Sequence, residues 1–485
     1  MKNLSMIMTR MGMLALLAIL WSCEESSETF DPINPNLSVE NVVGTIESAS
    51  RTLSGAERQL ALTLNEFVAV GAIASDNYVN TRTFFNQNFD ALVIATTDAD
   101  VNALQFDIAR LRALCTTALT EIGPADPDYT AEQESGFHFL RGLAYLYGGS
   151  YFVVLPGEAG GAAVPAATHL GLAIDDFTEA IRADGTGTYG LAAHIARARA
   201  NYLLGNKTEA VADANAIIAA APDFLYSGSF DAVNTSANDD NTMQDALFDR
   251  GSFDDLQPLP TLDFLDPKYN GSDPNFDFPT PICKVEEAHL ILVEAALSES
   301  RLEDAKGIMN DIIGLVATRP TATFDDRVEG RTDLDPDTRP NLASVMVSPG
   351  PGRDFESGLV LDRQAESVTV PTVSGTSFDA DEIAAISDID AAYEALYRMR
   401  QEIFIAEGMR FIDLGLRMPV SQREADANTN IVASDQEALV PAYLSGAGDI
   451  DAIEYDAGAG TCRVLVNVNE LISANRGSSD IAPFE

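Results

Sequence analysis

The chain has 485 residues, of which 74 are acidic and 30 are Lys or Arg, so its formal net charge at pH 7 is −44. Nucleic-acid binding depends on Lys and Arg side chains that neutralise phosphates, and this charge balance therefore argues against a DNA or RNA partner. Apolar residues make up 46% of the sequence and the acidic residues are scattered. This composition is sufficient for a large hydrophobic core and excludes the class of disordered acidic tails.

The first 23 residues have the pattern of an export signal that ends in a lipidation site. Lys2 and Arg10 precede an apolar run over residues 11–20, and the sequence Trp-Ser-Cys23 follows that run. A membrane-spanning helix needs about 20 apolar residues, whereas this shorter run is typical of a cleavable signal. The end of the run resembles the bacterial lipobox. We expect residues 1–22 to be removed and Cys23 to carry acyl chains, with an ordinary secretory signal as the alternative.

Residues 23–36 are polar and contain proline, as expected of a flexible tether between lipid and fold. Acidic residues directly after Cys23 resemble the signal that sends some bacterial lipoproteins to the outer face of the outer membrane. We therefore expect a chain that is lipid-anchored at the cell surface. Cys115, Cys283 and Cys462 allow at most one intramolecular disulfide, so no disulfide framework is expected.

Hydrophobic periodicity predicts a mainly α-helical fold. Helix pairs are expected at about residues 130–220 and 284–316, and Thr130 with Gln133 forms a capping-box pattern at the start of the first pair. The hairpin over residues 193–218 has the small-residue pattern of a tetratricopeptide repeat. With two more long helices between about residues 40 and 120, the sequence predicts a superhelix of about four such helix pairs.

Two segments, at about residues 223–283 and 318–388, are rich in Pro, Gly, Asp and Asn and have few periodic runs. Loops of this length inside a compact protein are usually functional surfaces or poorly ordered, so we expect loop-rich insertions here, which the family resemblance given below implies lie on the ligand side. Helical periodicity returns over residues 389–417, and the sequence around Arg463 predicts one short strand.

Four segments together resemble the SusD/RagB family of outer-membrane nutrient-binding lipoproteins. The most specific is Glu-Gly-Met-Arg-Phe-Ile-Asp-Leu over residues 407–414, which fits every fixed position of the pattern Glu-Gly-x-Arg-x-x-Asp-Leu. The others are residues 139–148, the hairpin over residues 193–218, and residues 284–295. The sequence departs from the family where Lys284 replaces the usual Arg, where Gly142 replaces a common Ala, and in the tail after about residue 450.

The resemblance implies one domain over residues 37–485, in which the helical superhelix packs against an irregular loop-rich half with little β structure. It also implies a partner, a TonB-dependent outer-membrane transporter of the SusC-like kind, and a ligand such as an oligosaccharide or a peptide. Catalysis, cofactors and metals are not implied. Two alternatives are a tetratricopeptide scaffold that assembles proteins at the outer membrane and a surface glycan hydrolase.

Sugar-binding proteins stack aromatic rings on pyranose faces and bind hydroxyls with Asn, Asp and Arg. The only Trp lies in the signal, at position 21, so Tyr and Phe must supply any aromatic platform. For each aromatic candidate, a place in the core is the alternative. By their position in the family pattern, the candidate ligand-binding residues are Asn77, Tyr78, Phe84, Phe85, Asn86, Tyr269 and Asn270.

Other motifs have structural interpretations. Glu407, Arg410 and Asp413 are expected to form ion pairs that fasten their helix to the loop-rich half. The glycines of residues 185–190 match a dinucleotide-binding pattern but follow a helix, so a turn is expected. Residues 98–102 resemble half of a calcium loop but lack its Gly and closing Glu. The four histidines are not spaced as metal ligands and no nucleophile elbow occurs, so no metal, cofactor or catalytic residue is predicted.

Overall fold

The computed structural model describes residues 43–80, 86–231, 240–248, 256–269, 275–331 and 339–478, together with Ile481 and Phe484. The predicted signal, Cys23 and the tether lie outside the described residues. None of the described helices is both long enough and apolar enough to cross a membrane.

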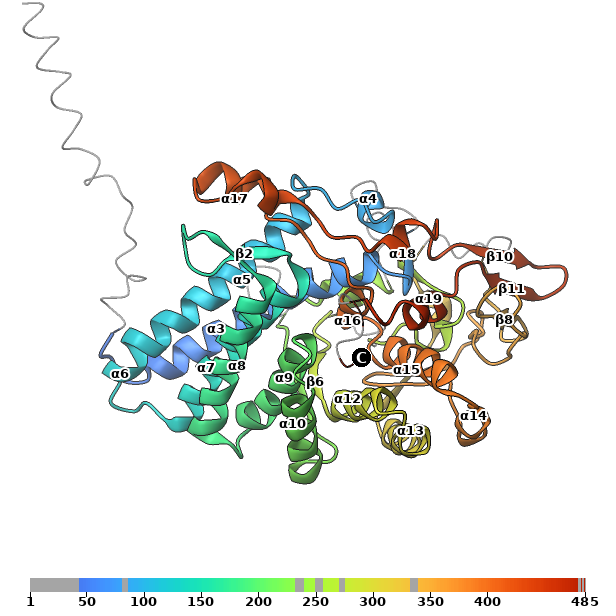
Figure 1. Cartoon of the computed structure of the whole chain (residues 1–485), viewed down its shortest axis with the longest axis horizontal. Helices are drawn as coiled ribbons and strands as arrows, with labels where there is room; N and C mark the ends of the chain where they lie inside the picture. The colour runs from blue at the N-terminus through green and yellow to red at the C-terminus, as the bar shows by residue number, and fades with distance from the viewer. Residues whose placement is uncertain are drawn as a thin grey trace, which may run out of the picture.

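Long helices in antiparallel pairs form one half of the molecule (Figure 1). Consecutive pairs pack side by side, because α5 contacts α7, α8 contacts α9, and α10 contacts α12. The mainly helical fold with about four helix pairs is therefore as predicted. The pairs are α3 (Ser48–Ile73) with α5 (Ala99–Thr117), α7 (Ala131–Tyr151) with α8 (Ala166–Asp184), α9 (Thr188–Leu203) with α10 (Lys207–Ala220), and α12 (Val285–Ser298) with α13 (Leu302–Val316).

Local sequence accounts for the helix boundaries. The Thr130 hydroxyl accepts from the Gln133 backbone and the Gln133 side chain accepts from the Thr130 backbone, so the predicted capping box is present at the start of α7. Gly205 has a φ of +74° between α9 and α10, a conformation that favours glycine. Ala193, Ala196 and other small residues of α9 are fully buried, which lets neighbouring helices approach closely.

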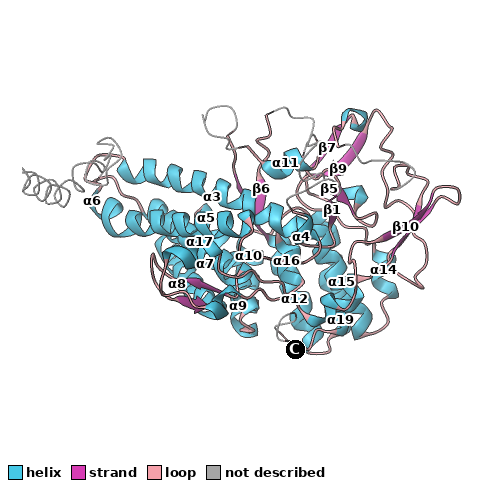
Figure 2. Cartoon of the chain, turned by 90° about the horizontal axis from the view of Figure 1, so that it is seen from above, coloured by secondary structure: helices cyan, strands magenta, loops and turns pink. Residues whose placement is uncertain are grey.

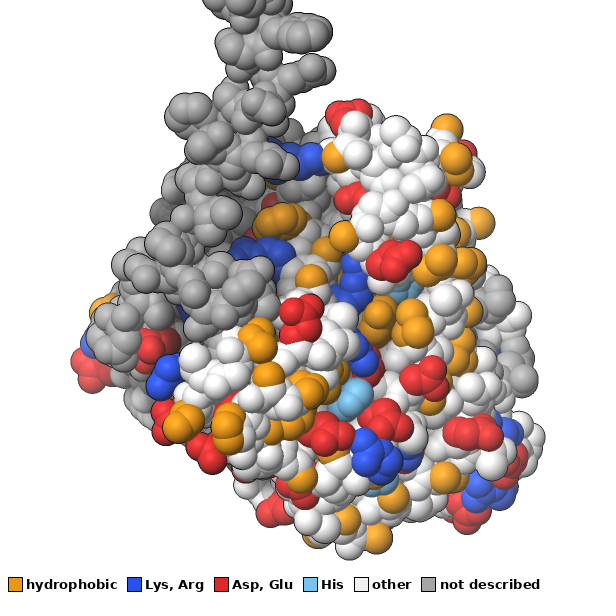
Figure 3. All heavy atoms as spheres, turned by 90° about the vertical axis from the view of Figure 1, so that its left-hand side faces the viewer, with side chains coloured by type: hydrophobic (Ala, Val, Ile, Leu, Met, Phe, Trp, Pro, Cys, Tyr) orange, Lys and Arg blue, Asp and Glu red, His pale blue; other side chains and the backbone are white. Residues whose placement is uncertain are grey.

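One polar cluster occurs twice in the helical half. His138 and Arg141 of α7 both bind Asp176 of α8, and His194 and Arg197 of α9 bind Asp213 of α10. In each cluster the histidine Nδ1 lies 2.8 Å from one carboxylate oxygen, and the arginine Nη2 donates to that same oxygen at 2.7 Å. Seen end-on, the helical half shows histidines beside basic and acidic side chains (Figure 3). These partly buried clusters join the two helices of a pair.

The other half consists of loops with short strands, most of which gather at the end away from α7 and α8 (Figure 2). The pairs are antiparallel except β8, which runs parallel to β11. The strand pairs are β1 (Tyr78–Asn80) with β5 (Leu256–Pro258), β2 (Val154–Pro156) with β3 (Ala163–Pro165), β4 (Leu225–Gly228) with β6 (Thr280–Lys284), β7 (Thr321–Phe324) with β9 (Val368–Pro371), and β10 (Ile453–Asp456) and β8 (Met346–Ser348) on the two sides of β11 (Thr461–Val464).

The remaining α-helices lie between or after these elements in the chain. They are α4 (Gln87–Asp90), α6 (Gly123–Ala125), α11 (Thr242–Ala246), α14 (Ala380–Ala385), α15 (Ile389–Ile403), α16 (Met409–Asp413), α17 (Gln422–Ala427), α18 (Ala442–Ser445) and α19 (Val468–Ala474). One hydrophobic core runs through both halves and includes Leu60 of α3, Leu290 of α12 and Leu396 of α15. The two halves therefore share buried residues of one core, and the single domain over residues 37–485 stays a prediction.

The predicted continuous helix over residues 389–417 is wrong, because α15 ends at Ile403 and α16 starts at Met409. Ala406 and Gly408 have positive φ values of 57° and 76°. Buried side chains bind the freed carbonyl groups, since the Lys268 ammonium donates to Ile405 O at 3.0 Å and the Tyr269 hydroxyl donates to Ala406 O at 2.6 Å. Tertiary hydrogen bonds therefore replace the helical ones in this segment.

Candidate functional site

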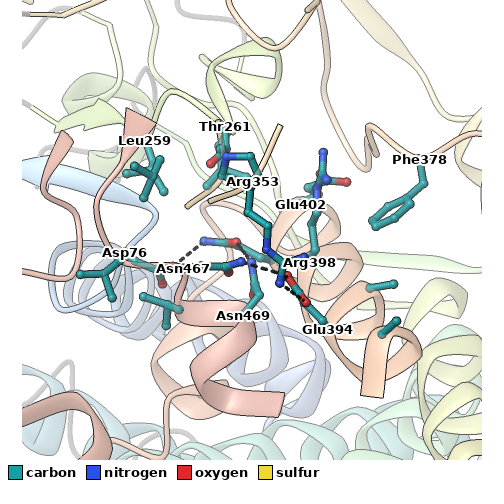
Figure 4. Close-up of a pocket in the computed structure, with 18 of the residues that line it drawn as sticks. Asp76, Leu259, Thr261, Arg353, Phe378, Glu394, Arg398, Glu402, Asn467 and Asn469 are labelled. Carbon is teal, nitrogen blue, oxygen red and sulfur yellow. Dashed lines mark hydrogen bonds and ion pairs between the residues drawn. The ribbon is translucent and has the colours of Figure 1, made fainter. Parts of the chain in front are cut away.

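A pocket opens in the loop-rich half, between α15 and the segment that leads from β11 into α19 (Figure 4). Its cavity has a volume of about 200 Å³. Segments distant in the sequence line it: the turn after α3, the loop after β5, the loop after β8, the segment before α14, α15 itself, and the start of α19. The lining includes Asp76, Leu259, Thr261, Leu262, Pro349, Arg353, Phe378, Ala391, Glu394, Ala395, Arg398, Gln401, Glu402, Val464, Val466, Asn467 and Asn469.

Helix α15 supplies the polar wall because its sequence is amphipathic. Tyr393 and Leu396 are buried in the core, whereas Glu394, Arg398 and Gln401 are spaced three or four residues apart and line the pocket. The helix begins after Asp388, whose carboxylate accepts from the Ala391 backbone N–H at 2.9 Å. The cap fixes where this polar face starts.

Arg353 and two carboxylates close one edge of the pocket (Figure 4). Its Nη2 donates to Glu394 Oε2 at 2.7 Å and to Glu470 Oε2 at 3.0 Å. The Asn467 Nδ2 group donates to the other Glu394 oxygen at 2.9 Å. Hydrogen bonds to Glu470 and Glu394, with the charge of both groups, raise the pKa of Arg353. This edge is therefore an ion-paired bridge between the loop after β8, α15 and α19.

Side-chain amides form the floor. Asn469 Nδ2 donates to Gln401 Oε1 at 2.8 Å, and Gln401 Nε2 donates to Asp76 Oδ2 at 2.9 Å. Arg410 in turn binds both oxygens of Asp76, at 2.6 and 2.8 Å. The Asn469 Oδ1 atom is buried and has no hydrogen-bond partner among the described residues. The floor is thus a fixed chain of polar groups that leaves one acceptor open.

The Phe378 ring packs against Arg398 of the α15 wall. The guanidinium carbon of Arg398 lies 5.0 Å from the centre of the Phe378 ring. Arg398 also binds Glu356 Oε2 at 2.8 Å and Glu402 Oε1 at 3.2 Å. Burial lowers the pKa of Arg398, but the charges of Glu402 and Glu356 outweigh burial and raise it above its ordinary value. Arg398 is therefore a cation held in place by two carboxylates, and its guanidinium group makes a cation–π contact with the Phe378 ring.

Solved structures share this arrangement of helix pairs and loops. A SusD-like protein from Bacteroides fragilis NCTC 9343 superposes with a TM-score of 0.54 at 10% identity, over 83% of this chain and 99% of its own. A candidate sugar binding protein from Bacteroides vulgatus ATCC 8482 gives a TM-score of 0.52 at 13% identity, over 80% and 98% of the two chains. A SusD superfamily protein from Parabacteroides distasonis ATCC 8503 gives 0.52 at 12% identity, again over 80% and 98%.

The chain has the SusD-like fold. The sequence matches no family model and no curated protein. At identities of 10 to 13%, these structures establish the shared fold of the chain.

Within this SusD-like fold, the segment Glu407–Asp413 supports the pocket from behind. Glu407 binds the ammonium groups of Lys268 and Lys284, Arg410 binds Asp76, and Asp413 binds Arg400. The three residues form buried ion pairs, as predicted, but each pairs with a different partner. They hold the break between α15 and α16 and the turn after α3 in place.

The described members of the ligand-binding set predicted from the sequence do not line this pocket. Asn77 is buried directly behind its floor, where its Oδ1 accepts from Gln401 Nε2 at 3.1 Å. Tyr78 and Tyr269 are 0% exposed, and Asn86 is also buried. Phe84, Phe85 and Asn270 lie outside the described residues. Contact of this set with a ligand stays a prediction, and in this conformation Tyr78 and Tyr269 contact only protein.

Sequence reasoning missed the residues that do line the pocket. The polar face of α15, with Glu394, Arg398 and Gln401, carried a readable spacing signal. Asn467 and Asn469, after the predicted short strand, carried a weaker one. Arg353 and Phe378 come from Pro- and Gly-rich stretches without periodicity, so no local pattern distinguished them.

The remaining motifs have structural roles. Residues 185–187 form the predicted turn between α8 and α9, and residues 188–190 begin α9. Asp98 caps α5 by accepting from the Asp100 backbone at 2.9 Å. No group of three or more His, Cys, Asp or Glu residues in the described ranges could hold a metal ion. Cys115, Cys283 and Cys462 are buried free thiols.

Proposed function

We propose that this protein is a lipid-anchored cell-surface receptor that binds an oligosaccharide in the pocket beside α15 and passes it to a TonB-dependent outer-membrane transporter. One observation carries the binding proposal: the pocket combines an aromatic ring, an apolar wall and fixed side-chain amides and guanidinium groups within about 200 Å³. Ligand sites are typically apolar clefts with a few convergent polar groups.

The chemistry of the lining suits a sugar. A pyranose has apolar C–H faces, which Phe378 and the side chains of Leu259, Leu262 and Val466 can cover. It also has hydroxyls, which can bind the polar groups of Asn467 and Asn469.

The pocket is proposed to bind without catalysis. Glycoside hydrolysis requires a carboxylic acid that donates a proton and a second carboxylate. The pocket carboxylates are Asp76, Glu394 and Glu402, and an arginine binds each of them. Each is held in an ion pair within the protein, so none of the three is free to contact a glycosidic oxygen or an attacking water.

The location and the partner rest on other features. The sequence up to Cys23 supports lipid anchoring, and the family resemblance supports delivery to a transporter. A protein from Bacteroides vulgatus ATCC 8482 with the same fold, a candidate sugar binding protein, supports the sugar as ligand. The fold does not favour a tetratricopeptide scaffold, because such a scaffold gives no role to the pocket.

Isothermal titration of the soluble chain from residue 24 against a panel of oligosaccharides tests binding. Ala391, partly exposed at the pocket wall, is replaced by Trp to fill the cavity, and Ala216, exposed on α10, is replaced by Trp as the matched control. We expect Ala391→Trp to weaken binding at least about tenfold and Ala216→Trp to leave it unchanged. Equal affinity in both variants would place the site elsewhere.

Three further measurements test the rest of the proposal. Release of new reducing ends from any panel member would contradict a purely binding role. Replacement of Cys23 by Ser should release the protein from the membrane fraction. Affinity purification of the anchored protein should recover an outer-membrane barrel transporter, and its absence would contradict the delivery step.

A further inference from the structure

We propose that the pocket selects an uncharged, hydroxyl-rich ligand, a neutral oligosaccharide, and excludes glycans that carry uronate or sulfate groups. This inference rests on the proposed function of the same pocket. Its basis is that all five charged side chains that line the pocket already have an ion-pair partner within the protein: Asp76, Arg353, Glu394, Arg398 and Glu402.

The two arginines in the lining are each held by two carboxylates. Arg353 binds Glu394 and Glu470, and Arg398 binds Glu356 and Glu402. A ligand carboxylate or sulfate would have to displace one of these acids to reach a guanidinium group. The displaced acid would stay close by, because Glu394 and Glu402 are on the α15 wall itself. An anionic ligand therefore meets a local excess of negative charge.

A paired arginine can still bind a neutral hydroxyl. The side-chain hydrogen bonds of Arg353 with the described residues all use Nη2, so Nε and Nη1 keep their N–H donors. The side chain is 40% exposed and lies at the edge of the pocket (Figure 4). A hydroxyl can accept from these donors without displacing Glu394 or Glu470.

The overall charge acts in the same direction. With a formal charge of −44, the protein repels polyanions at long range. Salt at physiological concentration screens exposed charges beyond about 8 Å, so this term is small in a saline medium. The ion pairs inside the pocket are less screened, and we assign the selectivity to them.

A charge-matched comparison tests the inference. Neutral glucan oligosaccharides and oligouronates of the same length are titrated against the wild-type chain from residue 24, at physiological salt. The pocket variant Glu394→Gln with Glu470→Gln frees Arg353. The control variant Glu47→Gln with Glu303→Gln makes the same change in net charge at side chains that are 64% and 85% exposed.

We expect the wild type and the control to bind a neutral oligosaccharide and to show no measurable affinity for the oligouronate. The pocket variant should bind the oligouronate at least about tenfold more tightly than the control does. Equal oligouronate binding by control and pocket variants would overturn the assignment to the pocket ion pairs. If the wild type binds the oligouronate and Ala391→Trp abolishes that binding, the neutral-ligand inference is overturned but the proposed site is kept. If Ala391→Trp leaves oligosaccharide binding unchanged from that of the wild type, the proposed function itself is contradicted.

Discussion

Arg410 and Asp76 lie 334 positions apart in the sequence and form a buried bidentate ion pair. The Arg410 Nε atom lies 2.6 Å from Asp76 Oδ1, and Nη2 lies 2.8 Å from Oδ2. The two side chains are 1% and 3% exposed. The pair joins the turn after α3 to α16 and holds Asp76 where Gln401 of the pocket floor can donate to it. The most specific sequence motif of the chain therefore connects both halves of the molecule at the site.

Replacement of Arg410 by Met should lower the free energy of unfolding by about 3–5 kcal/mol, because it leaves the Asp76 carboxylate buried without its partner. Urea denaturation of the soluble chain measures this change. The double variant Arg410→Met with Asp76→Leu removes both charges and should recover part of the loss.

The matched control is Arg182→Met, which breaks the ion pairs of an exposed arginine with Glu179 on α8 and Glu134 on α7. Exposed pairs contribute less than about 1 kcal/mol, so the control should change stability little. A loss in Arg410→Met no larger than in the control would show that the buried pair does not fasten the two halves.

The helix pairs could be predicted from the sequence because local patterns determine them. The capping box at Thr130 and the small residues of α9 each act within a few positions of the chain, and the structure has both. The end of α15 could not be predicted in this way. Buried groups from other segments, Lys268 and Tyr269, bind the carbonyls of residues 405 and 406, and no local periodicity reports such contacts.

The described members of the predicted ligand-binding set do not line the pocket, and their contact with a ligand stays a prediction. Tyr78 reads as a loop aromatic, yet it starts β1, which pairs with β5 and is covered by the core. The pocket is built from segments that meet only in three dimensions, such as Arg353 with Glu394 and Glu470. Only the three- and four-residue spacing of Glu394, Arg398 and Gln401 on α15 offered a local signal that could have placed lining residues together.

Glu294 should make the stability of the protein depend on pH. It is 0% exposed, and burial raises its pKa to about 7, although the Tyr202 hydroxyl, 2.6 Å from its Oε2, opposes the shift. In the unfolded chain its pKa is about 4.3. Between these values the folded state holds a proton that the unfolded state has lost. The stabilisation that this bound proton gives the folded state is therefore fully present below about pH 4.3 and is lost as pH rises through about 7.

Replacement of Glu294 by Gln keeps an acceptor for Tyr202 and removes the titration. The wild type should lose stability relative to the variant as pH rises. The free energy of unfolding of the variant minus that of the wild type should therefore be about 3 kcal/mol larger at pH 8 than at pH 4.5. Urea denaturation at the two pH values measures this difference. The exposed variant Glu303→Gln, at a side chain 85% exposed, should show no such dependence. A difference for Glu294→Gln that does not change with pH would mean that the group is ionised when folded.

The departure from the family pattern at Gly142 has a packing cause. A Cβ atom at this position of α7 would lie 2.6 Å from the Phe177 ring of α8, and both residues are buried. Gly142→Ala should therefore destabilise the protein by about 1–3 kcal/mol, since the clash outweighs the higher helix propensity of Ala.

Gly171 of α8 gives the matched control, because a Cβ there meets no atom within 4 Å. Gly171→Ala should stabilise the chain by about 0.5–1 kcal/mol in the same thermal or urea denaturation experiment. Adding Phe177→Leu should make Gly142→Ala less costly than it is beside Phe177, because the smaller side chain removes the clash. If the two single glycine variants instead gain stability equally, then the ring of Phe177 does not require glycine at position 142, and the helix pair has room for the common Ala.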